Sequence, residues 1–279
     1  MTRMVLLPED RSLPTGFVPE TPPQQPAEAK DAATVVLLRN GTTGLEVFLQ
    51  RRVKGMPFAG GMTVFPGGGV DQRDADTSVA WSGPDAQWWA ARFDCSPELA
   101  RALVCAAVRE TFEESGVLLA GPDTATVVGE TSRYAEARAA MVARNLSLAE
   151  FLADERLVLR ADLLRPWANW LTPEREPRRY DTRFFLAAMP EGQRADAVTT
   201  EAAEAYWATP EQALADFAEG RCHLLPPTRI TLDELVECGS MAAALAAERT
   251  LGKISPKLVR RNGRWHVVMP GEPGFEEAN

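Results

Sequence analysis

The sequence predicts an α/β protein. Residues 34–39 (TVVLLR) and 45–52 (LEVFLQRR) are rich in β-branched and apolar side chains and flank a loop with two glycines. A helix signal, Ser96-Pro97-Glu98, follows, and a further strand pattern, 183–187 (RFFLA), comes after alanine-rich segments. This alternation of strand runs with helical periodicity indicates a sheet that packs against helices.

Composition excludes some partners. The chain has 279 residues, 45% of them hydrophobic, and a formal charge of -9. We therefore expect no nucleic-acid backbone as the main partner, because the whole chain would be repelled by it. An anionic small molecule would need locally placed cations. The sequence has no apolar run long enough to cross a membrane, so we expect no membrane partner.

The cysteine pattern bears on the compartment. Cys95, Cys105, Cys222 and Cys238 form neither a CxxC pair nor a zinc spacing, so free thiols in a reducing environment are expected. We expect no export signal at the N-terminus, because its apolar stretch is short and no cleavage site follows it. We predict a cytoplasmic protein.

The chain is expected to form one domain over residues 31–270, after an irregular, proline-rich N-terminal arm over 1–30. We predict insertions at about 70–95 and 121–165, and a helical C-terminal extension. The first insertion carries Trp81, Trp88 and Trp89, for which packing is favoured over ligand binding.

Strands come first along the chain. The runs 34–39 and 45–52 predict a hairpin, and 62–65 predicts a short strand that leads into Pro66-Gly67-Gly68-Gly69. Glycines allow the backbone to approach a ligand closely, and a carbonyl there could bind a metal ion. A simple turn is the alternative interpretation of these glycines.

A long helix is predicted over residues 97–115. Ser96 is a typical N-cap, Pro97 suits the first helical position, and Gly116 is the natural stop. Its first half is apolar on most sides and should be buried. Further helices are expected at 133–145, 147–154, 210–220 and 232–251, and a strand or hairpin at 258–269.

The end of this helix is acidic. Glu110, Glu113 and Glu114 have the i, i+3, i+4 spacing that places side chains on one helix face. Oxygen ligands of this kind suit Mg²⁺ or Mn²⁺. A solvated acidic face is the alternative. The helix pattern argues against this alternative, because the three glutamates lie on the same side of the helix as Leu99 and Leu103, which should be buried. Acids that extend a buried helix face are typical of the rim of a pocket.

Residues 109–117 (RETFEESGV), read with Gly68, resemble the Nudix box, GX5EX7REUXEEXGU, in which U is a bulky apolar residue. Thr111 stands at the first U. The box has 13 residues between its glycine and arginine, whereas this chain has 40, so 27 are inserted. Counted back from Arg109, the first glutamate of the box falls on Arg101, and Glu98, one turn away, is the candidate substitute.

Within the Nudix hydrolase superfamily, the chain resembles the branch of peroxisomal-type coenzyme A diphosphatases, which carries a long insertion in the box. The resemblance includes residues 48–65, RETFEESGVLL, and WLTP with YDTRFF. A coenzyme A motif of the family matches in part, at Arg52, Gly61 and residues 65–68. The resemblance implies an α/β/α sandwich with a mixed sheet, and metal-dependent hydrolysis of a diphosphate linkage in a nucleoside-diphosphate derivative.

Site residues follow from the resemblance. It implies that Glu110, Glu113 and Glu114, with a carbonyl of Gly67 or Gly68, hold Mg²⁺ or Mn²⁺. Glu110 is a further ligand or the base, and Arg109 orients Glu113. Three arginines are candidates to bind substrate phosphates, each with a surface role as the alternative: Arg51, Arg52 and Arg183. Glu201 and Glu204 are candidates for an additional acid or for surface glutamates.

The substrate is less defined than the metal site. Coenzyme A or an acyl derivative is favoured, giving 3′,5′-ADP and a 4′-phosphopantetheine product. ADP-ribose, NADH or a nucleotide sugar is the alternative within the same class. A non-catalytic Nudix-fold ligand sensor is a third interpretation, which loss of the glutamates would signal, and all three are present. The resemblance also leaves a homodimer open.

Overall fold

The computed structural model describes residues 21, 23–56, 58–199, 201–276 and 278. Most of the predicted N-terminal arm lies outside these residues. The boundary at residue 30 is wrong, because the first strand already begins at Ala29 and its Lys30 pairs with Tyr180.

A mixed sheet forms the centre of the molecule, with the strand order β10-β2-β1-β9-β8-β11. β1 and β9 run parallel, as do β8 and β11, and the other pairs are antiparallel. The short strands β3 and β4 pair with β2 and β1. The bounds are β1 Ala29–Asn40, β2 Leu45–Arg52, β3 Thr63–Val64, β4 Gly67–Gly69, β8 Leu164–Leu171, β9 Arg179–Ala188, β10 Ala202–Ala208 and β11 Lys253–Ile254.

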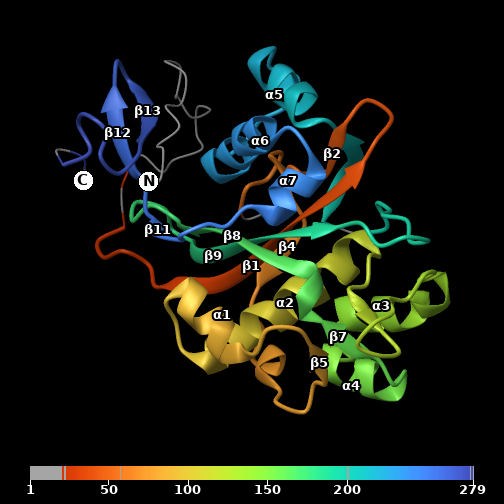
Figure 1. The fold of residues 1–279 in the computed structure, drawn as a ribbon. Helices are drawn as coiled ribbons and strands as arrows, with labels where there is room; N and C mark the ends of the chain where they lie inside the picture. The colour runs from red at the N-terminus through yellow and green to blue at the C-terminus, as the bar shows by residue number, and fades with distance from the viewer. Residues whose placement is uncertain (1–20, 22, 57, 200, 277, 279) are drawn as a thin grey trace.

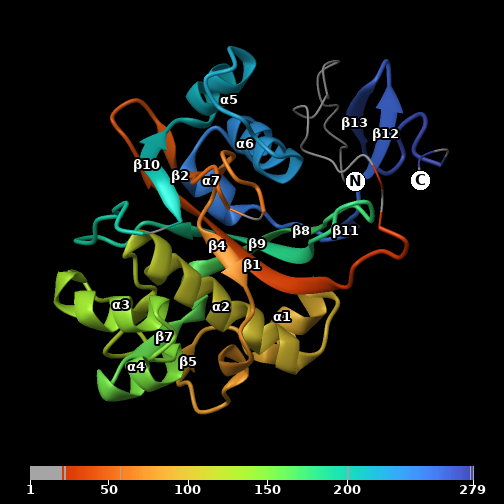
Figure 2. The same ribbon diagram turned by 180° about the vertical axis from the view of Figure 1, so that it is seen from behind.

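Helices cover both faces of this sheet (Figures 1 and 2). One face packs against α1 (Ala86–Phe93) and α2 (Pro97–Ser115), and the opposite face packs against α5 (Pro210–Ala218), α6 (Pro226–Cys238) and α7 (Met241–Ala246). Alternation along β1 explains the two cores, because Val35 and Leu37 face α2 while Val36 and Leu38 face the other layer. The predicted α/β/α sandwich is confirmed.

The two predicted insertions meet on one side of the molecule. The first holds the 3₁₀ turn η1 (Gln72–Ala75), β5 (Trp81–Ser82) and α1, and the second holds η2 (Ser132–Tyr134), α3 (Ala135–Val142), α4 (Leu148–Asp154), β7 (Val158–Arg160) and η3 (Ala161–Leu163). β5 and β6 (Ala120–Gly121) both pair with β7 in a small separate sheet. Trp89 is fully buried, stacked on Phe93 and against Phe185, so its packing role is confirmed.

The C-terminal part departs from the expectation in two ways. The predicted helix at 232–251 is instead α6 and α7, because Pro226 starts a helix earlier and Gly239 ends it in a left-handed conformation, with φ of 69°. The extension is also not wholly helical. Its last part is the hairpin of β12 (Lys257–Arg261) and β13 (Arg264–Val268), which confirms the strand or hairpin predicted at 258–269.

Candidate active site

The helix α2 has the bounds that the sequence predicts. The Ser96 hydroxyl accepts a hydrogen bond from the Leu99 amide at 3.2 Å, and Gly116 ends the helix with φ of 74°. The acidic end is not a solvated face. The side chains of Glu110 and Glu113 are 13% and 15% exposed, and Glu114 is buried.

The glycine run lies against these acids as strand β4, and not as a simple turn. Gly67 pairs with Thr34 of β1, and the Gly67 amide donates to Glu114 Oε2 at 2.9 Å. A Cβ on Gly68 would lie 2.5 Å from Glu110 Oε1. The carboxylates of α2 therefore pack directly on a backbone without side chains, which is the close approach that glycine permits.

Arg109 joins the acidic helix to the glycine strand. Its Nη1 donates to Glu110 Oε1 at 2.7 Å and lies 3.4 Å from Glu113 Oε2, and its Nη2 donates to the Gly69 carbonyl at 2.9 Å. Only 10% of the side chain is exposed. Arg109 therefore contacts both Glu113 and Glu110, and Glu110 is the closer partner.

Asp74 completes these contacts and was missed by sequence reasoning. Its Oδ1 and Oδ2 accept from Arg109 Nε and Nη2 at 2.8 and 2.9 Å, and Oδ2 also accepts from the Asp71 amide at 2.7 Å. Asp74 lies six positions after Gly68, where the box pattern has its first glutamate. Counting forward from the glycine, instead of back from Arg109, would have found it.

Two earlier assignments are thereby corrected. Glu98 does not substitute for the first glutamate of the box, because it lies exposed in the first turn of α2, more than two turns before Arg109. Arg101 instead donates to the carbonyls of Thr77 and Val79 in the insertion. The inserted residues therefore come after Asp74, between it and the arginine of the box, and leave the glycine-to-acid spacing intact.

The buried carboxylates resist ionisation. Burial, reinforced by Glu113, raises the pKa of Glu110 to about 7 even though Arg109 opposes the shift. Burial likewise raises the pKa of Glu113, and it raises that of Glu114 well above its ordinary value, with repulsion from Glu110 as the next cause. The carboxylates outnumber the single guanidinium among them, so further positive charge would be stabilising here.

The donor set fits a hard divalent cation, because it consists of carboxylate and carbonyl oxygens. Among the residues that the structure describes, however, no three acidic, histidine or cysteine side chains are gathered as a ready metal site. The contacts explain this: Glu110 and Glu113 point to Arg109, and Glu114 points to the Gly67 amide.

Among the arginines predicted to bind phosphate and the predicted additional acids, Arg52 and Glu201 lie at the site. Arg52 Nη2 pairs with Glu201 Oε2 at 2.9 Å, and both residues line the cavity described below. The charge of Arg52 lowers the pKa of Glu114, and the charge of Glu201 raises it. Arg51 and Glu204 form an exposed pair on the surface instead, and neither lines the cavity.

Arg183 is on the opposite face of the sheet from the cavity. It is buried on the side of α1 and α2, with Nη1 at 2.6 Å from Asp31 Oδ1 and 3.2 Å from Asp181 Oδ1. Its neighbours Thr182 and Phe184 line the cavity. The prediction that Arg183 binds substrate is therefore wrong, since side chains alternate between the two faces of a strand.

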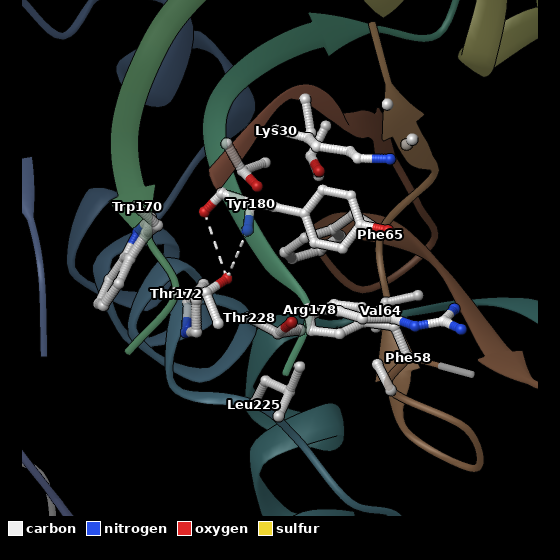
Figure 3. A pocket seen from close by; sticks show the side chains of 18 of the residues that line it. Lys30, Phe58, Val64, Phe65, Trp170, Thr172, Arg178, Tyr180, Leu225 and Thr228 are labelled. Carbon is white, nitrogen blue, oxygen red and sulfur yellow. Dashed lines mark hydrogen bonds between the residues drawn. The ribbon is translucent and has the colours of Figure 1, made fainter. Parts of the chain in front are cut away.

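A cavity of about 560 Å³ opens beside the acids (Figure 3). Its wall combines the glycine strand and Glu110 with Arg52 and Glu201. The rest of the wall is largely apolar or aromatic and includes Phe58, Phe65, Trp170, Tyr180, Leu225, Leu258 and Val267. These residues come from segments far apart in the sequence. Phe58, Phe65, Trp170 and Tyr180 lie in the stretches that carry the family resemblance, whereas Leu225, Leu258 and Val267 lie outside them.

Known proteins resemble this chain in sequence and in fold. The family model described as the NUDT19 Nudix domain matches residues 93–235, just over half of the chain. The chain belongs to the NUDT19 Nudix domain family. A NUDIX hydrolase from Alicyclobacillus acidocaldarius has a similar structure, with a TM-score of 0.70 and 28% identity, over 80% of this chain and 98% of that one.

Curated relatives of this Nudix chain are longer proteins. It is 27% identical over 239 residues to acyl-coenzyme A diphosphatase NUDT19 of Xenopus laevis, covering 71% of this chain and 61% of that protein. It is 28% identical over 219 residues to putative nudix hydrolase 7 of Caenorhabditis elegans, covering 74% and 57%. The chain thus spans about three-fifths of the length of these relatives. Within its described part, no helix has both the length and the apolar character to cross a membrane.

Proposed function

We propose that this Nudix chain is a pyrophosphohydrolase that cleaves the diphosphate linkage of a nucleoside-diphosphate derivative. The observation that carries the proposal is the buried group of Glu110, Glu113 and Glu114, packed on the glycine strand at the wall of the cavity. Membership of the Nudix family supports it.

The chemistry needs positive charge near the scissile linkage, because diphosphate oxygens repel a nucleophile. Glu113 and Glu114 would hold Mg²⁺ or Mn²⁺, with Glu110 as a further ligand or base and a carbonyl of Gly67 or Gly68 beside them. A bound divalent ion would supply Lewis acidity toward the phosphoryl oxygens and a water of lowered pKa. Arg109, fixed by Asp74, keeps the carboxylates of Glu110 and Glu113 in place.

Coenzyme A or an acyl-coenzyme A is the substrate that we favour. The relatives from Xenopus laevis and Gallus gallus, 27% and 29% identical, are named acyl-coenzyme A diphosphatases. The cavity supports this choice, since it is in the range of small-molecule sites and has apolar walls next to the acids. We further propose a cytoplasmic location, with which the four free cysteines are consistent, and leave a homodimer as a hypothesis for light scattering.

The deciding experiment incubates the protein with coenzyme A, an acyl-coenzyme A, ADP-ribose, NADH and a nucleotide sugar in Mg²⁺ or Mn²⁺, and separates the products. We expect coenzyme A or its acyl derivative to give 3′,5′-ADP. Cleavage of ADP-ribose alone would overturn the substrate choice. If the protein cleaves none of the panel, the non-catalytic sensor becomes the better interpretation.

The metal-site assignment has its own test. Glu113→Gln and Glu114→Gln should each reduce kcat by about 100-fold or more, because each removes an anionic ligand while keeping the side-chain volume. Glu136→Gln, on the exposed surface of α3, is the matched control and should leave turnover unchanged. Wild-type turnover in both folded site variants would contradict the assignment.

A further inference from the structure

Three polar side chains line the cavity apart from the acidic group: two from neighbouring strands and one from the residue before β9. Lys30 of β1 pairs in register with Tyr180 of β9, and Arg178 precedes Tyr180 by two residues. Tyr180 and Thr182 both line the cavity because side chains alternate along β9, and Arg178, one residue before β9, lines it too. Figure 3 shows the side chains of Lys30, Tyr180 and Arg178 extending in the same direction.

Lys30 and Arg178 differ from the other basic residues that line the cavity. Arg52 is ion-paired with Glu201, and Arg144 lies 3.9 Å from Asp71. Within the described part of the chain, the structure shows no ion pair for Lys30 or for Arg178, both of which are exposed. Their charge is therefore available to an anion that enters the cavity.

Glu176, the acidic residue nearest in sequence to Arg178 on the cavity wall, does not neutralise it. Burial alone raises the pKa of Glu176 to about 7, and no cation contributes to its environment. A carboxyl paired with Arg178 would instead be pulled toward its ionised form. Lys30 and Arg178 are thus two exposed cations on the wall of this cavity, in a chain whose formal charge is -9.

The place of Lys30 on β1 shows how far it lies from the glycine strand that packs on the acids. Ala32 pairs with Gly69 of the glycine strand, and Lys30 lies two residues before Ala32 on β1. Two residues of a strand span about 7 Å. A nucleotide with its diphosphate at the glycine strand could therefore place a second anionic group, carried on the same ribose, against Lys30.

We propose that Lys30 and Arg178, with the Tyr180 hydroxyl between them, bind a phosphomonoester of the substrate that is separate from the scissile diphosphate. The inference rests on the proposed function for the place of the diphosphate. It makes the chain selective for nucleoside diphosphates that carry an additional ribose 3′-phosphate. Lys and Arg supply charge-assisted hydrogen bonds to such a group, and the phenol hydroxyl supplies a neutral one.

The first test measures binding and needs no turnover. Calorimetry compares adenosine 3′,5′-bisphosphate with adenosine 5′-monophosphate, on the wild type and on the double variant Lys30→Met/Arg178→Gln. We expect the wild type to bind the bisphosphate about tenfold more tightly than the monophosphate, and the double variant to bind both equally. Arg194→Gln, an exposed arginine that does not line the cavity, should keep the preference.

Each other outcome overturns the proposal. It is wrong if the wild type binds the two nucleotides equally or binds neither, or if the double variant keeps the preference. A second arm compares hydrolysis of coenzyme A and of its analogue without the 3′-phosphate. KM should rise about tenfold in the double variant for coenzyme A only. If neither compound is hydrolysed by the wild type, the proposed function fails while the binding result still decides this subsite.

Discussion

Single residues determine how the acids are held. Arg109 contacts Asp74, Glu110, Glu113 and the Gly69 carbonyl, so one guanidinium links η1, β4 and α2. Arginine suits this position because its planar donors bind several oxygens at once and it stays charged when buried. Asp74, whose side chain is 1% exposed, is the bidentate partner that fixes the plane of that guanidinium.

A substitution tests this positioning role. Asp74→Asn should lower the free energy of unfolding by about 3 kcal/mol, because it removes one partner of a buried ion pair. It should also lower kcat, since Glu110 and Glu113 lose their fixed neighbour. Denaturant titration and steady-state kinetics measure the two effects.

The control for Asp74 is an exposed ion pair. Glu155→Gln removes a carboxylate that lies 3.7 Å from Arg133 on the surface, and should change stability by less than about 1 kcal/mol. If Asp74→Asn is as mild as this control in both measurements, Asp74 does not position Arg109.

At the scale of elements, α2 and β4 form the site together. α2 presents the acids, and β4 brings its backbone against them because it pairs with β1 through glycines alone. Gly67 shows the constraint most clearly. A Cβ there would lie 2.4 Å from the Ala33 carbonyl oxygen and 2.7 Å from the Thr34 Cα. Both neighbours are backbone atoms and cannot rotate away.

Gly67→Ala should therefore displace β4 from β1. We expect a loss of about 1–3 kcal/mol in the free energy of unfolding, as for other overpacked positions, and a fall in turnover because the Gly67 amide no longer reaches Glu114. Thermal unfolding and kinetics measure both. Gly129→Ala, where a Cβ meets open space, should be nearly neutral. Equal behaviour of the two variants would show that the strand tolerates a side chain.

At the scale of the whole molecule, the cavity gathers residues from the sheet, the β8–β9 connection, the start of α6 and the C-terminal hairpin. Burial in this wall has a global consequence. The Glu176 carboxyl has a pKa of about 7 in the folded chain, against 4.5 as its ordinary value. Between these pH values the folded chain binds more protons than the unfolded chain, so stability from Glu176 falls as pH rises through this window.

Glu176→Gln removes this titration. The free energy of unfolding of the variant, minus that of wild type, should increase as pH rises from 4.5 to 7. Above that range this difference should stay constant. Other titrating groups contribute equally to both proteins, so they cancel when denaturant unfolding is compared at each pH. A stability difference that does not change with pH would contradict the raised pKa.

The sequence determined the parts of this protein that depend on neighbours along the chain. Ser96 and Gly116 fixed the bounds of α2, and the spacing of Glu110, Glu113 and Glu114 placed them on one face, because capping and helical periodicity are local properties. The resemblance in residues 109–117 also gave the correct family and sandwich fold.

Only the tertiary structure decided which distant residues meet. It showed that Asp74, which the spacing from Gly68 could have identified, contacts Arg109 across 35 positions, and it paired Lys30 with Tyr180. It also turned Arg183 away from the cavity by the alternation of β9. These contacts depend on strand register and on where an insertion begins, which are set by packing of the whole sheet and not by local sequence.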